Sequence, residues 1–443
     1  MPQKKPSYFI DPFGCVKNQV DSENMMLFME KAGWERKPAE EADLIIVNSC
    51  GFIESAKQES INAVIGWRNL YPGKKILLAG CLAERYANEL AESLTEADGF
   101  MGVKDIKQID RIARNIINAS CDSGSQPLSD NLTGARPLLS LPGSAYVKIS
   151  EGCDNRCSYC AIPLIRGRLK SRTIPDIQNE CRTLLARGIK ELCIVAQDTG
   201  SFGRDVSPDG KLPQLLNAIG EIDGAFWVRL LYIHPDHFPL SILDIIEKDT
   251  RFLPYFDIPF QHASEKILRA MNRKGNAAGY LELLNNIRTR LPDAVIRSTF
   301  LLGFPDETEE DFAELLDFQE KAALDWLGCF AYSREENTAA WSMKKRISKK
   351  TAAARKQIIE EKQISITQKK MDRFAGRTLD VLIEEHMDEN LAIGRLYLQA
   401  PEIDGAAVIQ ADRLMPQAGS LVPCKATARR GIDLEVRLLI KEH

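Results

Sequence analysis

Three cysteines close together in the chain carry the strongest chemical signal. Cys153, Cys157 and Cys160 lie in the segment SEGCDNRCSYCAIP, with three and then two residues between them, directly after the apolar run AYVKI. Three thiolates can bind three irons of a 4Fe-4S cluster and leave the fourth iron open to a small ligand. Structural zinc sites and ferredoxin-type electron carriers use four protein ligands instead. The spacing therefore predicts an iron-sulfur cluster with an open coordination position.

A second set of cysteines lies near the amino terminus. Cys15, Cys50 and Cys81 each follow a short apolar run, and a helical pattern follows each cysteine; the runs are SYFID, DLIIVNS and KILLAG. This alternation predicts a parallel α/β sheet, in which ligands bind at the carboxyl edge of the strands. Each cysteine alone is compatible with a small buried residue. Because all three occupy the same place relative to their strands, we predict that they converge as a second three-thiolate site.

The elements that position these cysteines divide the chain into five segments. Residues 1–120 predict an α/β domain, and residues 121–143, rich in Ser, Gly, Pro and Asp, are typical of a linker. In residues 144–343, six apolar runs alternate with helical patterns and predict a partial (β/α)6 barrel whose cysteine loop follows the first strand. Residues 344–375 predict a basic helix, and residues 376–443 a small five-stranded OB-like β-barrel. The predicted fold class is multidomain α/β.

Composition excludes several classes of protein. The 443 residues are 44% hydrophobic and 27% charged, and the formal net charge is -4, so there is no overall basic field for nucleic acid. No apolar run approaches the ~18 residues of a membrane span, and the first residues lack a signal-peptide core. Eleven cysteines are too dilute for a disulfide scaffold. We therefore expect a cytoplasmic protein with no membrane contact.

Charge is unevenly distributed in the last hundred residues. The stretch Lys344–Phe374 contains 11 Lys plus Arg against 3 Asp plus Glu. It predicts either a solvated helix that bridges two domains or a face that contacts phosphates, for example those of rRNA. Residues 376–443 contain 8 Lys plus Arg against 11 Asp plus Glu, a net charge of -3. An acidic barrel suits a basic protein partner better than RNA.

Together these features resemble the radical S-adenosylmethionine methylthiotransferases, and the resemblance covers essentially the whole chain. That family combines an amino-terminal three-cysteine domain, a radical domain and a TRAM barrel. The segments FGCVKNQVDSENM and LQAPEIDGAAVI resemble the branch that modifies a ribosomal protein, and Lys17 stands where the tRNA-modifying branch usually has Met. The resemblance implies methylthiolation of the β-carbon of an aspartate in the twelfth protein of the small ribosomal subunit. The alternatives are a tRNA adenosine methylthiotransferase and a non-catalytic iron-sulfur carrier or scaffold.

The resemblance also implies cofactors and partners. It implies two 4Fe-4S clusters and S-adenosylmethionine: the cluster on Cys153, Cys157 and Cys160 generates a 5'-deoxyadenosyl radical, and the other cluster delivers sulfur. It further implies an electron donor such as flavodoxin or ferredoxin, and a sulfur donor. The vacancy in each set of cysteines argues against a simple electron carrier, because a carrier has no use for an open iron.

The resemblance assigns weaker roles to individual residues. Contacts with S-adenosylmethionine are expected from Tyr159, Gln197, Asp198, Arg229 and Gly303. Each residue also has a structural alternative. Tyr159 is compatible with an ordinary aromatic residue in a loop, and Gly303 with a turn. The polar residues Gln197, Asp198 and Arg229 are compatible with a helix cap or a loop hydrogen bond.

Contacts with the substrate are expected from Arg166, Arg168 and His262. The two arginines, with Arg172 beside them, face either an acidic substrate side chain or a cluster sulfide, or else they form a solvated loop. His262 contacts cofactor or substrate, or is a buried structural residue. The remaining cysteines are interpreted as small packing residues; they are Cys121, Cys181, Cys193, Cys329 and Cys424.

Overall fold

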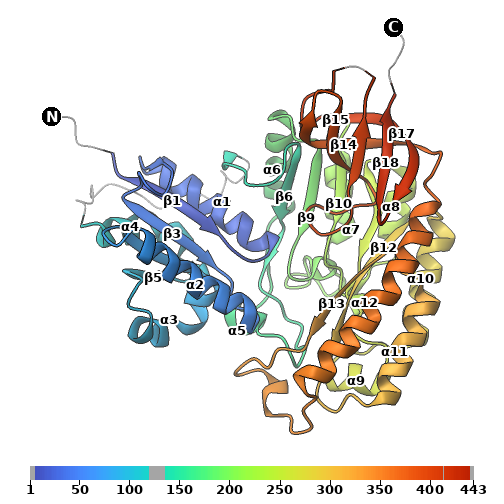
Figure 1. Ribbon diagram of the computed structural model, residues 1–443, viewed down its shortest axis with the longest axis horizontal. Coiled ribbons are helices and arrows are strands. Elements are labelled where there is room, and N and C mark those ends of the chain that lie inside the picture. The colour runs from blue at the N-terminus through green and yellow to red at the C-terminus, as the bar shows by residue number, and fades with distance from the viewer. Residues whose placement is uncertain (1–4, 119–134, 413, 440–443) are drawn as a thin grey trace. The chain divides into compact units, whose positions relative to one another are not determined.

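The computed structural model describes residues 5–118, 135–412 and 414–439. The chain forms two compact units. Figure 1 shows the ribbon in colours that follow the residue number. Unit 1 comprises Met1–Leu139, Glu151–Lys170 and Ser333–Trp341, and unit 2 comprises Ser140–Ser150, Ser171–Tyr332 and Ser342–His443. Residues 121–134 of the predicted linker, with Cys121, lie outside the described residues. No helix in the described ranges is long and apolar enough to cross a bilayer.

Unit 1 is built on a parallel sheet with the strand order β2-β1-β3-β4-β5, as the sequence predicted for an α/β domain. The two-residue strand β2, which the sequence did not predict, extends one edge. The elements are β1 (Ser7–Pro12), α1 (Val16–Lys31), β2 (Glu35–Arg36), β3 (Leu44–Ser49), α2 (Glu54–Leu70), β4 (Lys75–Gly80), α3 (Cys81–Ser93), β5 (Gly99–Met101), the 3-10 turn η1 (Val103–Gln108) and α4 (Ile109–Ile116).

Strand β3 shows why this sheet forms. All six residues of β3 are buried, as expected for a central parallel strand that is covered on both faces. Leu44 and Ile46 belong to one hydrophobic cluster, whereas Ile45 and Val47 belong to another. Because side chains alternate along a strand, these two clusters lie on opposite faces of the sheet and hold its helices there. The carboxyl edge of the sheet is then left for the loops that carry Cys15, Cys50 and Cys81.

Unit 2 contains the predicted six-stranded parallel half-barrel, with the strand order β13-β12-β11-β10-β9-β6. Its strands are β6 (Ser144–Lys148), β9 (Glu191–Val195), β10 (Trp227–Leu230), β11 (Phe252–Asp257), β12 (Val295–Leu302) and β13 (Trp326–Ala331). The intervening helices are α6 (Ile174–Ala186), α7 (Leu212–Gly220), α8 (Ile242–Lys248), α9 (Glu265–Ala270), α10 (Ala277–Arg290) and α11 (Glu309–Ala322). The short turns of unit 2 are η3 (Thr199–Ser201) and η4 (Pro235–His237). The turn η5 (Ala339–Ser342) and the small strand pair β7 (Ser150–Glu151) and β8 (Lys170–Ser171) fall at the boundaries of the two units along the chain.

The carboxyl-terminal residues form the predicted closed five-stranded barrel, with the order β14-β15-β16-β18-β17. The strands are β14 (Thr378–Asp388), β15 (Leu391–Leu396), β16 (Ala407–Gln410), β17 (Leu421–Arg430) and β18 (Asp433–Leu438). The sequence indicated four of these strands. It did not indicate β17, because Pro423 and a run of polar residues conceal its alternation.

The basic stretch forms helix α12 (Lys349–Asp372), which lies along β13 and α11 in Figure 1. The helix begins at Ser348, whose side chain accepts a hydrogen bond from the Thr351 backbone nitrogen. A stripe of buried residues runs along one face, at Ala352, Arg355, Ile359, Gln363, Thr367 and Met371. The helix is therefore packed against the half-barrel along its whole length. The opposite face is exposed, so the contact with phosphates stays a prediction.

A buried ionic cluster joins the half-barrel to the carboxyl-terminal barrel inside unit 2. Glu191, at the start of β9, is fully buried and accepts hydrogen bonds from Arg229 Nε at 2.7 Å and from Arg395 Nη1 at 3.2 Å. Arg395 on β15 also pairs with Glu384 on β14. Burial would raise the pKa of Glu191, but Arg395 and Arg229 lower it to about 2, so the carboxylate is charged at neutral pH.

Removing one partner of this cluster should cost much more stability than removing an exposed ion pair. We expect Arg395→Met to lower the free energy of unfolding by ~3–5 kcal/mol, because Glu191 loses a buried cation. The control Arg430→Met removes a side chain that is 84% exposed and pairs with Glu435, and should cost less than ~1 kcal/mol. Urea unfolding of both variants measures the difference. Equal effects would contradict the cluster's role.

Candidate active site: two three-cysteine sites in unit 1

The first three-cysteine site lies at the carboxyl edge of the amino-terminal sheet, and we call Cys15, Cys50 and Cys81 the sheet site. Cys15 is the residue before α1, Cys50 follows β3, and Cys81 begins α3 directly after β4. Because β1, β3 and β4 are neighbours in the sheet, their ends deliver the three cysteines to one place. Electrostatic interactions of Cys81 with both Cys15 and Cys50 are consistent with that proximity.

Glycines beside the cysteines allow the three loops to approach closely. A Cβ atom on Gly14 would lie 2.9 Å from the Cβ atom of Cys50, and one on Gly51 would lie 2.6 Å from the Cys81 carbonyl oxygen. Gly80 has φ of +99°, and a Cβ atom there would lie 2.3 Å from Asn48 Oδ1. Only glycine fits such positions. Sequence reasoning did not single out these three glycines, although each is adjacent to a cysteine of the sheet site.

Asn18 on α1 connects the three loops of the sheet site. Its Nδ2 donates to the carbonyl oxygens of Phe13 at 3.2 Å and Ser49 at 2.8 Å, and its Oδ1 lies 3.2 Å from Cys81 Sγ. The side chain is buried, with 1% of the residue exposed. An amide offers donors and an acceptor together, so one residue satisfies groups on the loops after β1, β3 and β4.

The three thiols of the sheet site differ in how readily they ionise. Desolvation opposes ionisation of Cys15, but Lys17, Arg166 and nearby backbone N–H groups hold its thiol pKa below the usual value. Burial raises the pKa of Cys50, and it raises that of Cys81 to about 12. A metal ligand must be the thiolate, so bound iron would have to overcome this cost at Cys81.

The second site lies on the loop before α5 (Ile162–Arg166), and we call Cys153, Cys157 and Cys160 the loop site. The Cys153 nitrogen donates to the Gly167 carbonyl at 3.1 Å, and the Cys160 nitrogen donates to the Cys157 carbonyl at 3.0 Å. These bonds fold the loop back on itself. All three cysteines and Tyr159 are partly exposed. The predicted contact of Tyr159 with adenine stays a prediction.

The segment Ser333–Trp341 supports both the loop site and the helices of the sheet. The Ala340 nitrogen donates to the Ser158 carbonyl at 2.8 Å, inside the cysteine loop. Glu335 is 2% exposed and pairs with Arg85 on α3 at 2.7 Å and Lys57 on α2 at 3.1 Å. Sequence reasoning did not find Glu335, because nothing in the segment REENT indicates that one of its two glutamates is buried.

Donor chemistry tests whether these residues fit iron-sulfur clusters. Each site offers three thiols, the ligand type that such clusters use, and no carboxylate or imidazole joins a set. Among residues 5–118, 135–412 and 414–439, no three His, Cys, Asp or Glu side chains are grouped closely enough for a single metal ion. A cube binds each cysteine through a different iron, so its ligands surround a space instead of meeting at one atom. The residues therefore fit a cluster better than a mononuclear metal.

The two predicted substrate arginines lie in very different environments. Arg166 is buried, and its Nη2 lies 3.2 Å from Cys81 Sγ of the sheet site. Arg166 therefore lies beside a cysteine of the sheet site, and its predicted contact with a substrate carboxylate or a cluster sulfide stays a prediction. Arg168 has 90% of its side chain exposed and pairs with Asp154 at 3.2 Å, so it is a solvated loop residue in this structure. Its predicted contact with substrate stays a prediction.

The predicted cofactor residues of the half-barrel have structural partners. Asp198, after β9, accepts hydrogen bonds from Ser201 Oγ at 2.6 Å and the His234 nitrogen at 3.1 Å, and lies 2.7 Å from His237 Nδ1. Burial opposes ionisation, but His237 and His234 hold the Asp198 pKa well below its usual range. Asp198 thus caps η3 and orients His237, a residue that sequence reasoning missed. Gln197 is half-buried beside it.

Arg229 lies in the buried ionic cluster described above. Arg229 makes two contacts besides the hydrogen bond from its Nε to Glu191. Its Nη1 donates to the Tyr397 carbonyl at 2.7 Å, and its guanidinium lies over the Tyr255 ring, 4.6 Å from the ring centroid. These contacts give Arg229 a structural role between the two barrels. The predicted contacts of Gln197, Asp198 and Arg229 with S-adenosylmethionine stay predictions.

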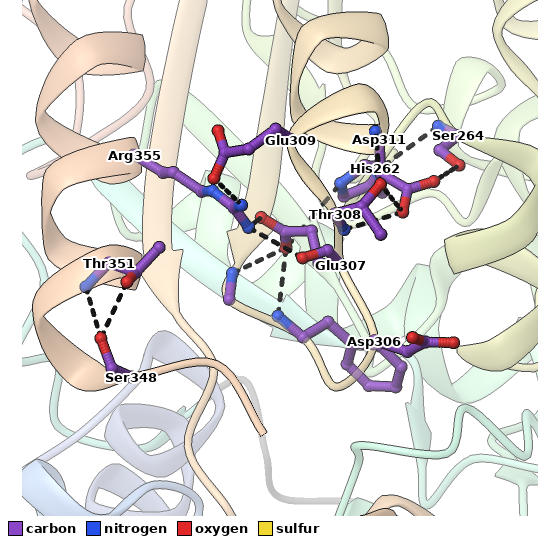
Figure 2. Close-up of polar contacts among 12 residues, drawn as sticks. His262, Ser264, Asp306, Glu307, Thr308, Glu309, Asp311, Ser348, Thr351 and Arg355 are labelled. Atoms are coloured by element: carbon purple, nitrogen blue, oxygen red, sulfur yellow. Dashed lines mark hydrogen bonds and ion pairs between the residues drawn. The ribbon is translucent and has the colours of Figure 1, made fainter. Parts of the chain in front are cut away.

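Figure 2 shows the turn after β12 with His262, which follows β11, beside it. Gly303 in this turn and His262 were predicted to contact ligands. Glu307 is buried there and accepts from the Gly303 nitrogen at 2.7 Å and from Arg355 Nη1 at 2.6 Å. Gly303 has φ of +74°, and a Cβ atom would lie 2.5 Å from the Ala352 Cβ. The turn alone therefore requires glycine here. Sequence reasoning missed the Glu307–Arg355 pair, since Arg355 lies in a stretch that reads as solvated.

His262 is fully buried beside this turn. Its Nδ1 accepts a hydrogen bond from the Ser264 nitrogen at 3.0 Å, and its Nε2 lies 3.9 Å from Glu307 Oε2, too far for a hydrogen bond. Burial lowers the His262 pKa to about 3, so the ring is neutral at physiological pH. The four remaining described cysteines are buried, in agreement with packing roles; they are Cys181, Cys193, Cys329 and Cys424.

Comparisons with known proteins agree with this architecture. Family models match residues 7–102 (Uncharacterized protein family UPF0004), 147–318 (Radical SAM superfamily) and 375–439 (TRAM domain). Among solved structures, the radical S-adenosylmethionine methyltransferase TsrM from Kitasatospora setae aligns with a TM-score of 0.53 and 16% identity, covering 76% of this chain and 77% of that one. The cobalamin-dependent S-adenosylmethionine radical enzyme OxsB aligns with a TM-score of 0.53 and 12% identity, covering 81% of this chain and 56% of that one. These likenesses show the fold alone.

The combination of a three-cysteine α/β domain, a radical S-adenosylmethionine half-barrel and a TRAM barrel defines the class of this protein. Two curated relatives are both described as ribosomal protein uS12 methylthiotransferase RimO. The relative from Treponema denticola is 46% identical, and the alignment covers 96% of this chain and 99% of the relative. The relative from Syntrophomonas wolfei is 41% identical, and the alignment covers 95% of this chain and 97% of the relative. The chain belongs to the RimO family of radical S-adenosylmethionine methylthiotransferases.

The electrostatics of the sheet site predict an order of thiol reactivity. In the metal-free protein at neutral pH, iodoacetamide should modify Cys15 faster than Cys81, because the thiolate is the nucleophile and Cys81 is buried with a raised pKa. Lys17→Met should slow modification of Cys15, whereas Lys31→Met, at the far end of α1, should not. Peptide mass spectrometry after timed labelling measures each rate. Equal rates for Cys15 and Cys81 would contradict this picture.

Proposed function

We propose that this protein attaches a methylthio group to the β-carbon of an aspartate in ribosomal protein uS12. The observation that carries the proposal is the pair of three-cysteine sites in one unit, within a chain that is 46% identical to a uS12 methylthiotransferase along nearly its whole length. The C–H bonds at that carbon are unactivated, and no side-chain base that is poised near neutral pH can deprotonate them usefully. The reaction therefore needs cofactor chemistry.

Two 4Fe-4S clusters and S-adenosylmethionine are the cofactors that we assign. When bound, they supply one-electron cleavage of a sulfonium bond at one cluster and sulfur at the other. The loop site would hold the first cluster, since its three cysteines have the spacing, three and then two residues apart, that resembles the radical S-adenosylmethionine enzymes. The sheet site would hold the second. In each site, three protein thiolates leave one iron for a small molecule.

The surrounding residues keep the two sets of thiols in place. Glycines beside the sheet-site cysteines permit the loops to meet, and Asn18 ties these loops together. The Ser333–Trp341 segment holds the cysteine loop through Ala340 and fixes α2 and α3 through Glu335. This support is needed because three thiols must be spaced for different corners of one cube.

A tRNA adenosine methylthiotransferase is the second candidate, and the relatives do not favour it. The chain has Lys17 and the tract LQAPEIDGAAVI, and the carboxyl-terminal barrel has a net charge of -3, which suits a basic ribosomal protein. The exposed basic face of α12 remains available for rRNA beside that protein. We further propose a cytoplasmic location, a sulfur donor, and a small electron carrier such as flavodoxin or ferredoxin.

Separate variants of the two sites should lose different activities. After anaerobic reconstitution, Cys157→Ala should abolish reductant-dependent formation of 5'-deoxyadenosine, because the loop site loses a ligand. Cys50→Ala should retain that cleavage but give no methylthiolation of uS12. The matched control is Cys181→Ala, a buried cysteine outside both sites. Chromatography of the nucleoside and mass spectrometry of uS12 measure the two outcomes.

Two results would refute the proposal. Methylthiolation of uS12 by the Cys50→Ala variant would remove the sheet site from the reaction. Modification of tRNA but not of uS12 by the unaltered protein would replace the proposed substrate with the second candidate.

A further inference from the structure

Arg166 belongs to the segment that carries the loop site but its guanidinium lies at the sheet site. It is the last residue of α5, six positions after Cys160. Ala161 and Ile165, four residues apart on the same side of this segment, pack with Cys81 in a small hydrophobic cluster. The chain that leaves the loop site is therefore packed directly against a ligand candidate of the sheet site.

The guanidinium of Arg166 is held by four side chains. Its Nη2 lies 2.6 Å from Asn18 Oδ1, 2.8 Å from Asp21 Oδ2 and 3.2 Å from Cys81 Sγ, while Nη1 donates to Glu151 Oε1 at 2.7 Å. The side chain of Arg166 is 1% exposed, and so is that of Asp21. Only a planar, forked cation can reach acceptors on both of its ends in this way.

Cys81 changes its hydrogen-bonding character when it binds iron. A thiol can donate its hydrogen to Asn18 Oδ1, at 3.2 Å in this structure, whereas a thiolate ligand is only an acceptor. Arg166 Nη2 is then the donor that remains beside the sulfur. A charged N–H donor stabilises negative charge on cluster sulfur, and such hydrogen bonds tune cluster potentials.

We infer that Arg166 is a positioning residue that fixes Cys81 against the segment carrying the loop site and raises the reduction potential of the cluster in the sheet site. This inference rests on the proposed function, because it assumes that the sheet site binds a cluster. Arg166 then has two effects. Its hydrogen bond to Cys81 favours the reduced cluster, and its contacts with Asp21 and Glu151 hold the loop-site segment in a fixed position beside the sheet site.

The test uses full-length protein in which Cys153, Cys157 and Cys160 are all replaced by Ala, so that only the sheet site can bind a cluster. After anaerobic reconstitution this parent should bind about four irons per chain. A redox titration followed by electron paramagnetic resonance then gives its midpoint potential. In the same background, Arg166→Gln should shift the potential to more negative values and change the signal, while Arg111→Gln, at an exposed position on α4, should leave both unchanged.

A second pair of variants separates the hydrogen bond from net charge. Arg166→Met combined with Asp21→Asn removes one cation and one anion together, so the local charge is preserved while the hydrogen-bond donor of residue 166 is lost. We expect its potential to stay more negative than that of the parent. Arg166→Lys keeps the charge without the fork, and we expect a partial shift. Far-ultraviolet circular dichroism checks that each variant is folded.

Each outcome decides between the two claims. If the parent binds no iron, the sheet-site cluster and this inference both fail. If the parent binds iron but Arg166→Gln and Arg166→Lys both match its potential, the inference fails and the proposed function stands. If the double variant returns to the parent's potential, charge alone explains the shift, and the hydrogen bond to Cys81 is refuted.

Discussion

The geometry of a parallel sheet is the constraint on which the rest of this structure depends. Because β1, β3 and β4 are adjacent and run in the same direction, the residues that follow them must emerge at one edge. Cys15, Cys50 and Cys81 are separated in sequence by more than thirty positions, yet their loops pack within van der Waals distance. Strand order thus brings together three thiols that are far apart in sequence.

The close approach of these loops depends on small residues and buried polar groups. Gly14, Gly51 and Gly80 leave no room for a side chain, and Asn18 satisfies carbonyl oxygens that would otherwise be buried without a donor. Arg166 adds a cation beside Asp21 and Cys81, where ionised cysteines would add further negative charge. The site is therefore arranged to hold anionic sulfur in a position that burial alone would disfavour.

Local patterns in the sequence predicted much of this architecture. The apolar runs of β3 and β9 and the helical patterns beside them were sufficient for the two parallel sheets, and all eleven residues of these two strands are buried. Strand β17 was missed because its residues do not alternate clearly. The cysteines of the loop site were identified by their spacing and those of the sheet site by their position relative to strands, although the binding of iron stays a prediction.

Long-range polar contacts could not be predicted in the same way. Arg229 reads as a strand residue near a cofactor, but it pairs with Glu191, and the cation that completes the cluster is Arg395, far away in the sequence. Glu335 and Arg355 likewise lie in stretches that read as solvated, and their burial follows from packing against distant elements. The sequence gives the charge and the hydrogen-bonding groups of a side chain, but only the fold determines which residue it pairs with.

The content of iron and labile sulfide per chain after anaerobic reconstitution tests the central claim most directly. Two 4Fe-4S clusters on two separate three-cysteine sites predict about eight irons and about eight sulfides. About four of each would contradict the claim, because only one of the two sites would then hold a cluster.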